Sequence, residues 1–206
     1  AHRPGTSHYY FTEYLFDLDT VLDILGWDQC HLVGHSMGGG VASCFAAAFP
    51  ERVNRLVLLD SLGLLTLPPG QAAKQLRLSM ISVRKARSFL RPYESVEEAM
   101  RARQKKSPLS DDAARLLCER SLEHTGDYYQ WRTDPRLNWR SPQLSGDDQS
   151  LEMLSAIQSP ALVITSPTVI DYFSEDIAHK RLAAIPDCRH VVNEGHHHFH
   201  MEQAEQ

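Results

Sequence analysis

A serine lies between two glycines in the segment Gly-His-Ser-Met-Gly-Gly, which spans residues 34–39. An apolar run at 30–33 precedes this segment and a run of small residues follows it, so Ser36 falls where a predicted strand gives way to a predicted helix. The pattern Gly34-x-Ser36-x-Gly38 at such a turn is typical of a nucleophile elbow, which lifts the serine Oγ clear of the sheet. The strand and the helix nearly touch there, so we expect that both glycine positions must lack a side chain. Ser36 is the predicted nucleophile.

The two neighbours of Ser36 have predicted roles of their own. The backbone N–H of Met37, at the start of the helix, is expected to face the oxyanion of a bound carbonyl group, and His35 is a candidate substrate contact. The alternative for this segment is a phosphate-binding turn or a plain glycine-rich connection. The segment lacks the lysine of a P-loop and the glycine spacing of a dinucleotide site, which favours the nucleophile.

Four histidines near the carboxyl end are candidates for the base that a serine hydroxyl needs. His196, His197, His198 and His200 all follow the last predicted strand. A purification tag does not fit, because Phe199 interrupts the run and natural sequence continues after it. A metal site is not predicted, because no carboxylate or cysteine lies nearby in a recognised ligand spacing. We expect one of these histidines to reach the nucleophile.

The elements that must position these residues alternate between helices and apolar strands, which indicates an α/β fold. The pattern predicts helices at 12–25, 39–49 and 175–184 and strands at 30–33, 55–60, 161–165 and 189–192. The strand at 55–60 is a continuous apolar run of the kind found in parallel sheets that are covered on both faces. Between residues 62 and 158 the alternation stops. This segment is predicted to be an inserted helical subdomain, with helix-like stretches at 71–90, 94–106 and 110–122 and then a polar region.

Four stretches together resemble the α/β-hydrolase superfamily and, more narrowly, the serine hydrolase-like proteins. They are GHSMGG (34–39), PERVNRLVLLDSLG (50–63), WRTDPRLNW (131–139) and GHHHFHMEQ (195–203). The resemblance implies an α/β-hydrolase fold with a mostly parallel sheet, a core formed by residues 1–61 and 159–206, and a helical cap at 62–158. The cap would bound the acyl pocket, where Trp131 and Trp139 are candidate lining residues, with ordinary core packing as the alternative for both.

The resemblance also orders the catalytic residues along the chain as nucleophile, acid and histidine. In this superfamily the base commonly stands three positions before an ending of the type His, apolar, Glu. The ending here is at residues 200–202, which selects His197 as the base, with His196 as the second choice.

Two carboxylates are candidates for the acid that orients this histidine. One superfamily arrangement takes the acid from the loop after the strand at 161–165, where Asp171 is the first acid, and the other takes it from the end of the strand at 55–60, where Asp60 stands. These are expected to be adjacent strands about 4.8 Å apart, so either carboxylate could orient the same imidazole. Register favours Asp60, whose alternative role is to accept hydrogen bonds from turn N–H groups.

The fold that the chain resembles has several strands before the helix at 12–25, and a loop among them supplies a second oxyanion donor. This sequence contains no such segment. We therefore hypothesise that the chain is a fragment of a longer hydrolase whose N-terminal strands are missing. In that case the strand at 30–33 forms an exposed apolar edge.

The composition of the chain indicates which binding partners and which cellular compartment fit it. The 206 residues carry a net charge of −5, so no overall positive field draws the chain to nucleic acid or to an anionic membrane. No apolar run approaches the ~18 residues that a membrane span needs. Four scattered cysteines form no C-x-x-C pair, which indicates neither a zinc site nor a disulfide framework and favours a cytoplasmic location. The oligomeric state is left open.

The resemblance implies hydrolysis of a small-molecule carboxylic ester, or of a thioester or lactone, through an acyl-enzyme and without a metal or organic cofactor. A dehalogenase of this fold would need Asp in place of Ser36, which disfavours that reaction. Hydrolysis of a carbon–carbon bond or an epoxide is the alternative chemistry. The alternative from another class is a non-catalytic relative that binds a small ligand or a partner.

Overall fold

Four parallel strands form the central sheet of the computed structural model, which describes residues 8–85 and 90–204 apart from the side chains of Ile170 and Asp171. In spatial order they are β1 (Cys30–His35), β2 (Val53–Leu59), β5 (Ala161–Thr165) and β6 (Cys188–Val192). The predicted α/β fold with a mostly parallel sheet is confirmed. β1 lies at the edge of this sheet, and its Val33 is 66% exposed. The hypothesis that the chain is a fragment stays a prediction.

The carboxyl ends of β1, β2 and β5 meet at one edge of the sheet. His35 at the end of β1 is level with Leu59 at the end of β2, and β2 is paired in turn with β5. Residues that follow these strands therefore emerge side by side, as ligand-binding residues do in open parallel sheets. They include Ser36 after β1, Asp60 after β2 and Ser166 after β5.

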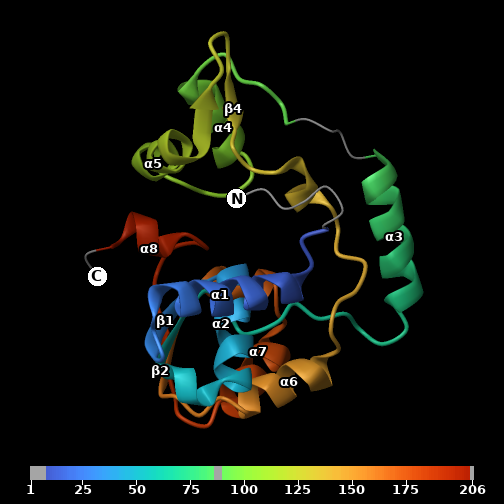
Figure 1. The fold of residues 1–206 in the computed structure, drawn as a ribbon, viewed down its shortest axis with the longest axis vertical. Helices are drawn as coiled ribbons and strands as arrows, with labels where there is room; N and C mark the ends of the chain where they lie inside the picture. The colour runs from blue at the N-terminus through green and yellow to red at the C-terminus, as the bar shows by residue number, and fades with distance from the viewer. Residues whose placement is uncertain (1–7, 86–89, 205–206) are drawn as a thin grey trace.

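Helices pack around this sheet at one end of the molecule (Figure 1). They are α1 (Phe11–Leu25), α2 (Met37–Ala48), α6 (Asp147–Ser155) and α7 (Glu175–Ala184). α2 packs against β1 and β2, and it also contacts α1 and α6. No helix in the described part of the chain has both the length and the apolar character that a membrane-spanning segment requires.

The main hydrophobic cluster lies between the sheet and these helices. Its largest apolar side chains are Leu22, Phe45, Leu56, Leu58, Leu62, Leu154, Ile157, Phe173 and Ile185. Phe199, which begins the short helix α8 (Phe199–Glu202), is also buried. Leu62, Leu154 and Ile157 come from the segment in which a cap is predicted, so both ends of that segment pack with the sheet. The domain division at 62–158 itself stays a prediction.

A second hydrophobic cluster lies at the opposite end of the molecule (Figure 1). It is formed by Tyr93, Ala99, Met100, Ala114, Cys118 and Leu122. The elements that supply it are α4 (Val96–Gln104), α5 (Asp111–Ser121) and a hairpin of β3 (Leu122–His124) and β4 (Tyr129–Trp131). The hairpin was not predicted from the sequence. Its two strands are three residues each, and the turn between them contains Gly126, whose φ is 95°.

The remaining elements are one longer helix and several short ones. α3 (Ala72–Lys85) stands apart from both of them, and the short helices are η1 (Pro50–Arg52), η2 (Pro135–Asn138) and η3 (Pro167–Asp171). The helix predicted at 71–90 ends at Lys85 in the described residues, and 86–89 lie outside them.

Arg181 of α7 ties the two ends of this intervening segment to the core. Its side chain is 1% exposed and donates hydrogen bonds to the carbonyls of Leu62 (2.9 Å) and Leu64. It also donates to Thr66 Oγ1 and Asp147 Oδ1, both at 2.9 Å. One guanidinium group therefore holds the chain on both sides of the segment in place.

Candidate active site

Ser36 lies in the turn between β1 and α2, in a backbone conformation that residues with a Cβ rarely adopt. Its φ is 54° and its ψ is −123°. Two hydrogen bonds hold this turn. The Ser36 N–H donates to the Leu59 carbonyl (3.0 Å), and the Gly39 N–H donates to the Ser36 carbonyl (2.9 Å). The serine thus has the strand, turn and helix context of a nucleophile elbow.

The glycines of this turn correct one part of the expectation. A Cβ at Gly34 would lie 2.5 Å from the Gly38 carbonyl oxygen, so position 34 must lack a side chain, as expected. A Cβ at Gly38 would meet nothing within 4 Å, so the expectation for that position is wrong. Gly38 faces outward in the first turn of α2, and Gly39 faces the residues that follow β2 instead, where a Cβ would lie 2.4 Å from Ser61 Cβ.

The N–H of Met37 stands at the first position of α2, directly after Ser36. The first N–H groups of an α-helix have no acceptor within the helix, and the positive end of the helix dipole lies at the same place. The Met37 residue is 54% exposed. This N–H is therefore placed to donate to a negatively charged oxygen beside Ser36.

His197 bonds Ser36 on one side and a carboxylate on the other. Its Nε2 lies 2.8 Å from Ser36 Oγ, and its Nδ1 lies 2.7 Å from Asp60 Oδ2. His196, the second candidate, is exposed, and its carbonyl accepts a hydrogen bond from the N–H of Phe199 (2.8 Å). The structure thus brings together Ser36, His197 and Asp60 from three distant parts of the sequence.

Asp60 is the carboxylate that reaches the imidazole, and its side chain is fully buried. It follows β2 with a φ of 46°, a second positive value at this edge of the sheet. The other candidate, Asp171, ends η3, and its side chain lies outside the described residues. Because Asp60 accepts the bond from His197 Nδ1, its geometry is that of the acid in a triad.

Ser166 is a positioning residue that the sequence reasoning missed. Its N–H donates to Asp60 Oδ1 (2.7 Å), and its Oγ lies 2.9 and 3.0 Å from the two Asp60 oxygens. Ser166 is 1% exposed, so water does not compete for these bonds. Its place directly after the strand at 161–165 was the available signal, because that strand was expected to lie beside the one that ends at Asp60.

Three more histidines pack beside His197. The Nε2–H of His35 donates to the His197 carbonyl (2.7 Å), and the rings of His35 and His200 lie 4.2 Å apart between centroids. The ring of His198 lies 5.2 Å from that of His35. Burial lowers the pKa of His35 and His200, and it lowers the pKa of His198 to about 4, so all three are neutral at pH 7. His35, expected to contact substrate, supports the backbone of His197.

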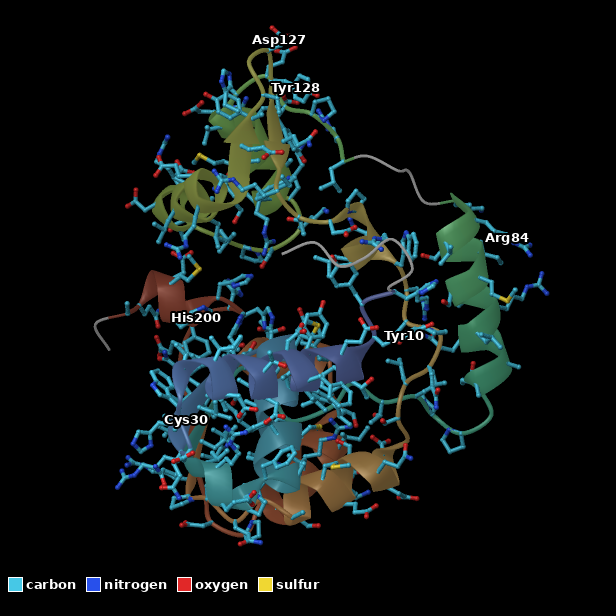
Figure 2. All side chains as sticks on the ribbon, in the orientation of Figure 1. Tyr10, Cys30, Arg84, Asp127, Tyr128 and His200 are labelled. Carbon is cyan, nitrogen blue, oxygen red and sulfur yellow. The ribbon has the colours of Figure 1, made fainter. Side chains whose placement is uncertain are left out.

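The two tryptophans lie elsewhere. Trp131 packs against the second cluster, where its Nε1–H donates to Tyr93 Oη (3.4 Å). Trp139 lines a cavity of about 290 Å³ between the start of α1 and α3, whose walls also carry Tyr10 and Arg84 (Figure 2). Ser36 is not among the residues that line this cavity. The acyl-pocket role of both tryptophans stays a prediction.

The chain is similar to known protein families. A family model described as "alpha/beta hydrolase fold" matches residues 1–197. A serine hydrolase-like protein of Dictyostelium discoideum is 32% identical over 215 residues, which cover 98% of this chain and 59% of that protein. A serine hydrolase-like protein of Danio rerio is 28% identical over 222 residues, which cover 100% of this chain and 66% of that protein. The chain thus spans about three fifths to two thirds of the length of these curated relatives.

A solved structure is similar over the whole chain. The crystal structure of a hypothetical protein from Pseudomonas aeruginosa PAO1 has a TM-score of 0.86 and 30% sequence identity. The match covers 100% of this chain and 73% of that one. The arrangement of strands around Ser36 is therefore a known one.

Proposed function

Since the chain belongs to the alpha/beta hydrolase fold family, we propose that it is a serine hydrolase that cleaves a carboxylic ester through an acyl-enzyme on Ser36. The observation that supports this most is the unbroken series of hydrogen bonds from Asp60 through His197 to Ser36, at 2.7 and 2.8 Å. A nucleophile, a base and an acid in this order are what acyl transfer by serine requires.

In the first half of the reaction, Ser36 Oγ attacks the carbonyl carbon of the ester while His197 Nε2 takes its proton. The tetrahedral intermediate carries a negative oxygen, which the Met37 N–H stabilises. The intermediate then collapses, the C–O bond of the ester breaks, and the imidazolium gives its proton to the leaving alcohol. Asp60 holds His197 in the tautomer that carries its proton on Nδ1 and stabilises the imidazolium.

In the second half, a water molecule attacks the acyl-enzyme and gives a proton to His197. The carboxylic acid leaves, and Ser36 recovers its hydrogen from the imidazolium. A thioester or a lactone fits the same steps, because each offers a carbonyl carbon with a leaving group. The proposed substrate is a small molecule.

A fluorophosphonate probe tests the nucleophile directly. We expect one covalent adduct per chain, located at Ser36 by peptide mass spectrometry, and turnover of p-nitrophenyl esters that falls by about 10⁶-fold in Ser36→Ala. Ser155→Ala is the matched control, because Ser155 is an exposed serine on α6 that bonds only the Glu152 carbonyl in the described residues. Circular dichroism would first establish that each variant is folded.

Two outcomes would reject the proposal. Labelling that persists in the Ser36→Ala variant would place the reactive group elsewhere. A folded chain that takes up no probe and turns over no ester would leave a non-catalytic relative that binds a ligand.

A further inference from the structure

His35, His198 and His200 form a cluster of three imidazoles next to the triad. His35 comes from the end of β1, whereas His198 and His200 flank the start of α8. One ring nitrogen of each residue lies within 4.8 Å of the other two. We propose that these three histidines bind a divalent transition-metal ion of the Zn²⁺ type. The spacing of residues along the sequence did not indicate this set, because His35 comes from the nucleophile segment, far from His198 and His200.

The hydrogen bond of His35 leaves the lone pair of its Nδ1 available to a metal ion. Because its Nε2–H donates to the His197 carbonyl at 2.7 Å, its Nδ1 keeps the lone pair. Metal-ligating histidines usually donate their other N–H to a backbone carbonyl or a carboxylate, which fixes the ring in its binding orientation. His35 therefore already has the outer partner of a metal ligand.

His200 supplies an unpaired polar atom. Its Nδ1 is buried and has no hydrogen-bond partner among the described residues. Buried polar atoms are normally paired, so an atom of this kind calls for an explanation such as an ion. Figure 2 shows His200 where the core faces the elements of the second cluster. A metal ion between His200 and His35 would pair this nitrogen.

His198 offers a ring nitrogen that a cation already approaches. The guanidinium of Arg103, on α4, lies with its Nη2 3.2 Å from His198 Nε2. A guanidinium donates hydrogen bonds only, so His198 accepts with a lone pair of the neutral ring. The proposed metal ion competes with Arg103 for this lone pair, and its binding releases α4 from the histidine.

The geometry requires a small closure of the three rings. Zn–N bonds of about 2.0–2.1 Å in a tetrahedral site place ligand nitrogens about 3.3 Å apart, so separations of up to 4.8 Å must shorten by about 1.5 Å or less. His197 is not a fourth ligand, because its two nitrogens bond Ser36 and Asp60. The fourth position is open to water.

Binding of Zn²⁺ without any substrate tests the proposal. We expect the chain to take up one equivalent in equilibrium dialysis or in competition with a chromophoric chelator. His198→Phe and His200→Phe should each weaken binding by more than the roughly 100-fold that loss of an outer partner can cost. His179→Phe is the control, since His179 is exposed on α7. His198→Gln replaces the first variant should that variant fail to show a cooperative thermal transition.

A variant of Arg103 separates a built site from adventitious binding. Arg103→Met removes the competing cation and should tighten Zn²⁺ binding by roughly tenfold, because a unit charge about 4 Å away acts with an energy on this scale. Absence of stoichiometric binding, or binding unchanged in both His198→Phe and His200→Phe, would overturn the proposal. Because no step uses an ester or Ser36, the result is independent of the proposed hydrolase activity.

Discussion

The main and the second hydrophobic clusters differ in what they hold in place. The main cluster supports the sheet edge that carries Ser36 and Asp60, and backbone atoms contact one another directly there, as the position of Gly34 shows. The second cluster is smaller, and the helix α4 that belongs to it contacts the site region through Arg103 and His198. The main cluster thus holds Ser36 and Asp60 in position, whereas the second cluster holds α4, whose Arg103 contacts a histidine beside them.

The two clusters are therefore expected to respond differently to substitution. A change on the sheet edge should alter the rate of the chemical step or prevent folding. A change of similar size in the second cluster should loosen local structure and leave that step intact.

Asp60→Asn removes the carboxylate that bonds His197 Nδ1. We expect kcat for ester hydrolysis to fall by about 10⁴-fold, because the amide favours the wrong tautomer of the histidine and cannot stabilise the imidazolium. Asp134→Asn is the control: Asp134 is also a buried carboxylate, but its partners are Arg136 and Tyr9. A tenfold or smaller loss in Asp60→Asn, measured by steady-state kinetics, would contradict the assignment of the acid.

Gly34→Ala tests how tightly the backbones pack beneath the nucleophile. The new Cβ would lie 2.5 Å from the Gly38 carbonyl oxygen, so we expect the free energy of unfolding to fall by about 3 kcal/mol. Gly38→Ala meets no atom within 4 Å and should change stability by less than about 1 kcal/mol. Urea unfolding of the two variants makes the comparison. Equal stabilities would show that the turn has room at both positions.

Met100→Ala probes the second cluster by itself. Met100 is 5% exposed, and its truncation should destabilise the surrounding helices by about 2 kcal/mol. Hydrogen exchange should become faster in α4 and α5 and stay unchanged in β1 and β2. The rate of Ser36 labelling by the fluorophosphonate probe should be retained. A matching loss of protection in the sheet would mean that the two clusters unfold as one unit.

Asp147→Asn gives the smallest and the most pH-dependent effect. The hydrogen bond from Thr66 and the guanidinium of Arg181 hold the pKa of Asp147 below its usual value, so the ionised form stabilises the folded chain. This contribution is present above pH ~4 and disappears as the pH falls through the lowered pKa. With the side chain 40% exposed, solvent screens the pair, and we expect a loss of about 1 kcal/mol at pH 7.

Urea unfolding at pH 7, 5 and 3 follows this loss. The difference in the free energy of unfolding between the unmodified chain and Asp147→Asn should shrink toward zero at the lowest pH. The protonated carboxyl group is then neutral, as the amide is at every pH. A difference that stays constant across these pH values would assign the effect to packing.

The parts of the site that the sequence predicted are those encoded by neighbouring residues. Ser36 was predicted because its glycines and the flanking strand and helix lie within a short segment. The ending at residues 200–202 selected His197 through the family resemblance. Register favoured Asp60 over Asp171 only narrowly, because both follow adjacent strands, and it is the three-dimensional arrangement that places the Asp60 carboxylate on the imidazole.

The parts that could not be predicted depend on contacts between distant residues. Ser166 bonds Asp60 across 106 positions, and Arg103 reaches His198 across 95 positions. The β3–β4 hairpin was missed for another reason, because strands of three residues are too short for alternation to be recognised. The expectation for Gly38 was wrong because successive residues of an α-helix point in directions about 100° apart, so Gly38 faces solvent whereas Gly39 faces Ser61.

The anchoring of the inserted segment by Arg181 has a consequence for changes in the length of that segment. Thr66 and Ser145 form a bridge, and the Leu67 N–H donates to the Ser145 carbonyl (2.9 Å), so the segment leaves and rejoins the sheet domain at a single point. The free-energy cost of bringing the ends of a loop together depends only weakly on the loop's length and rises by about 0.6 kcal/mol for each doubling. Insertions and deletions between these two residues should therefore add little to the free-energy cost of closing this segment.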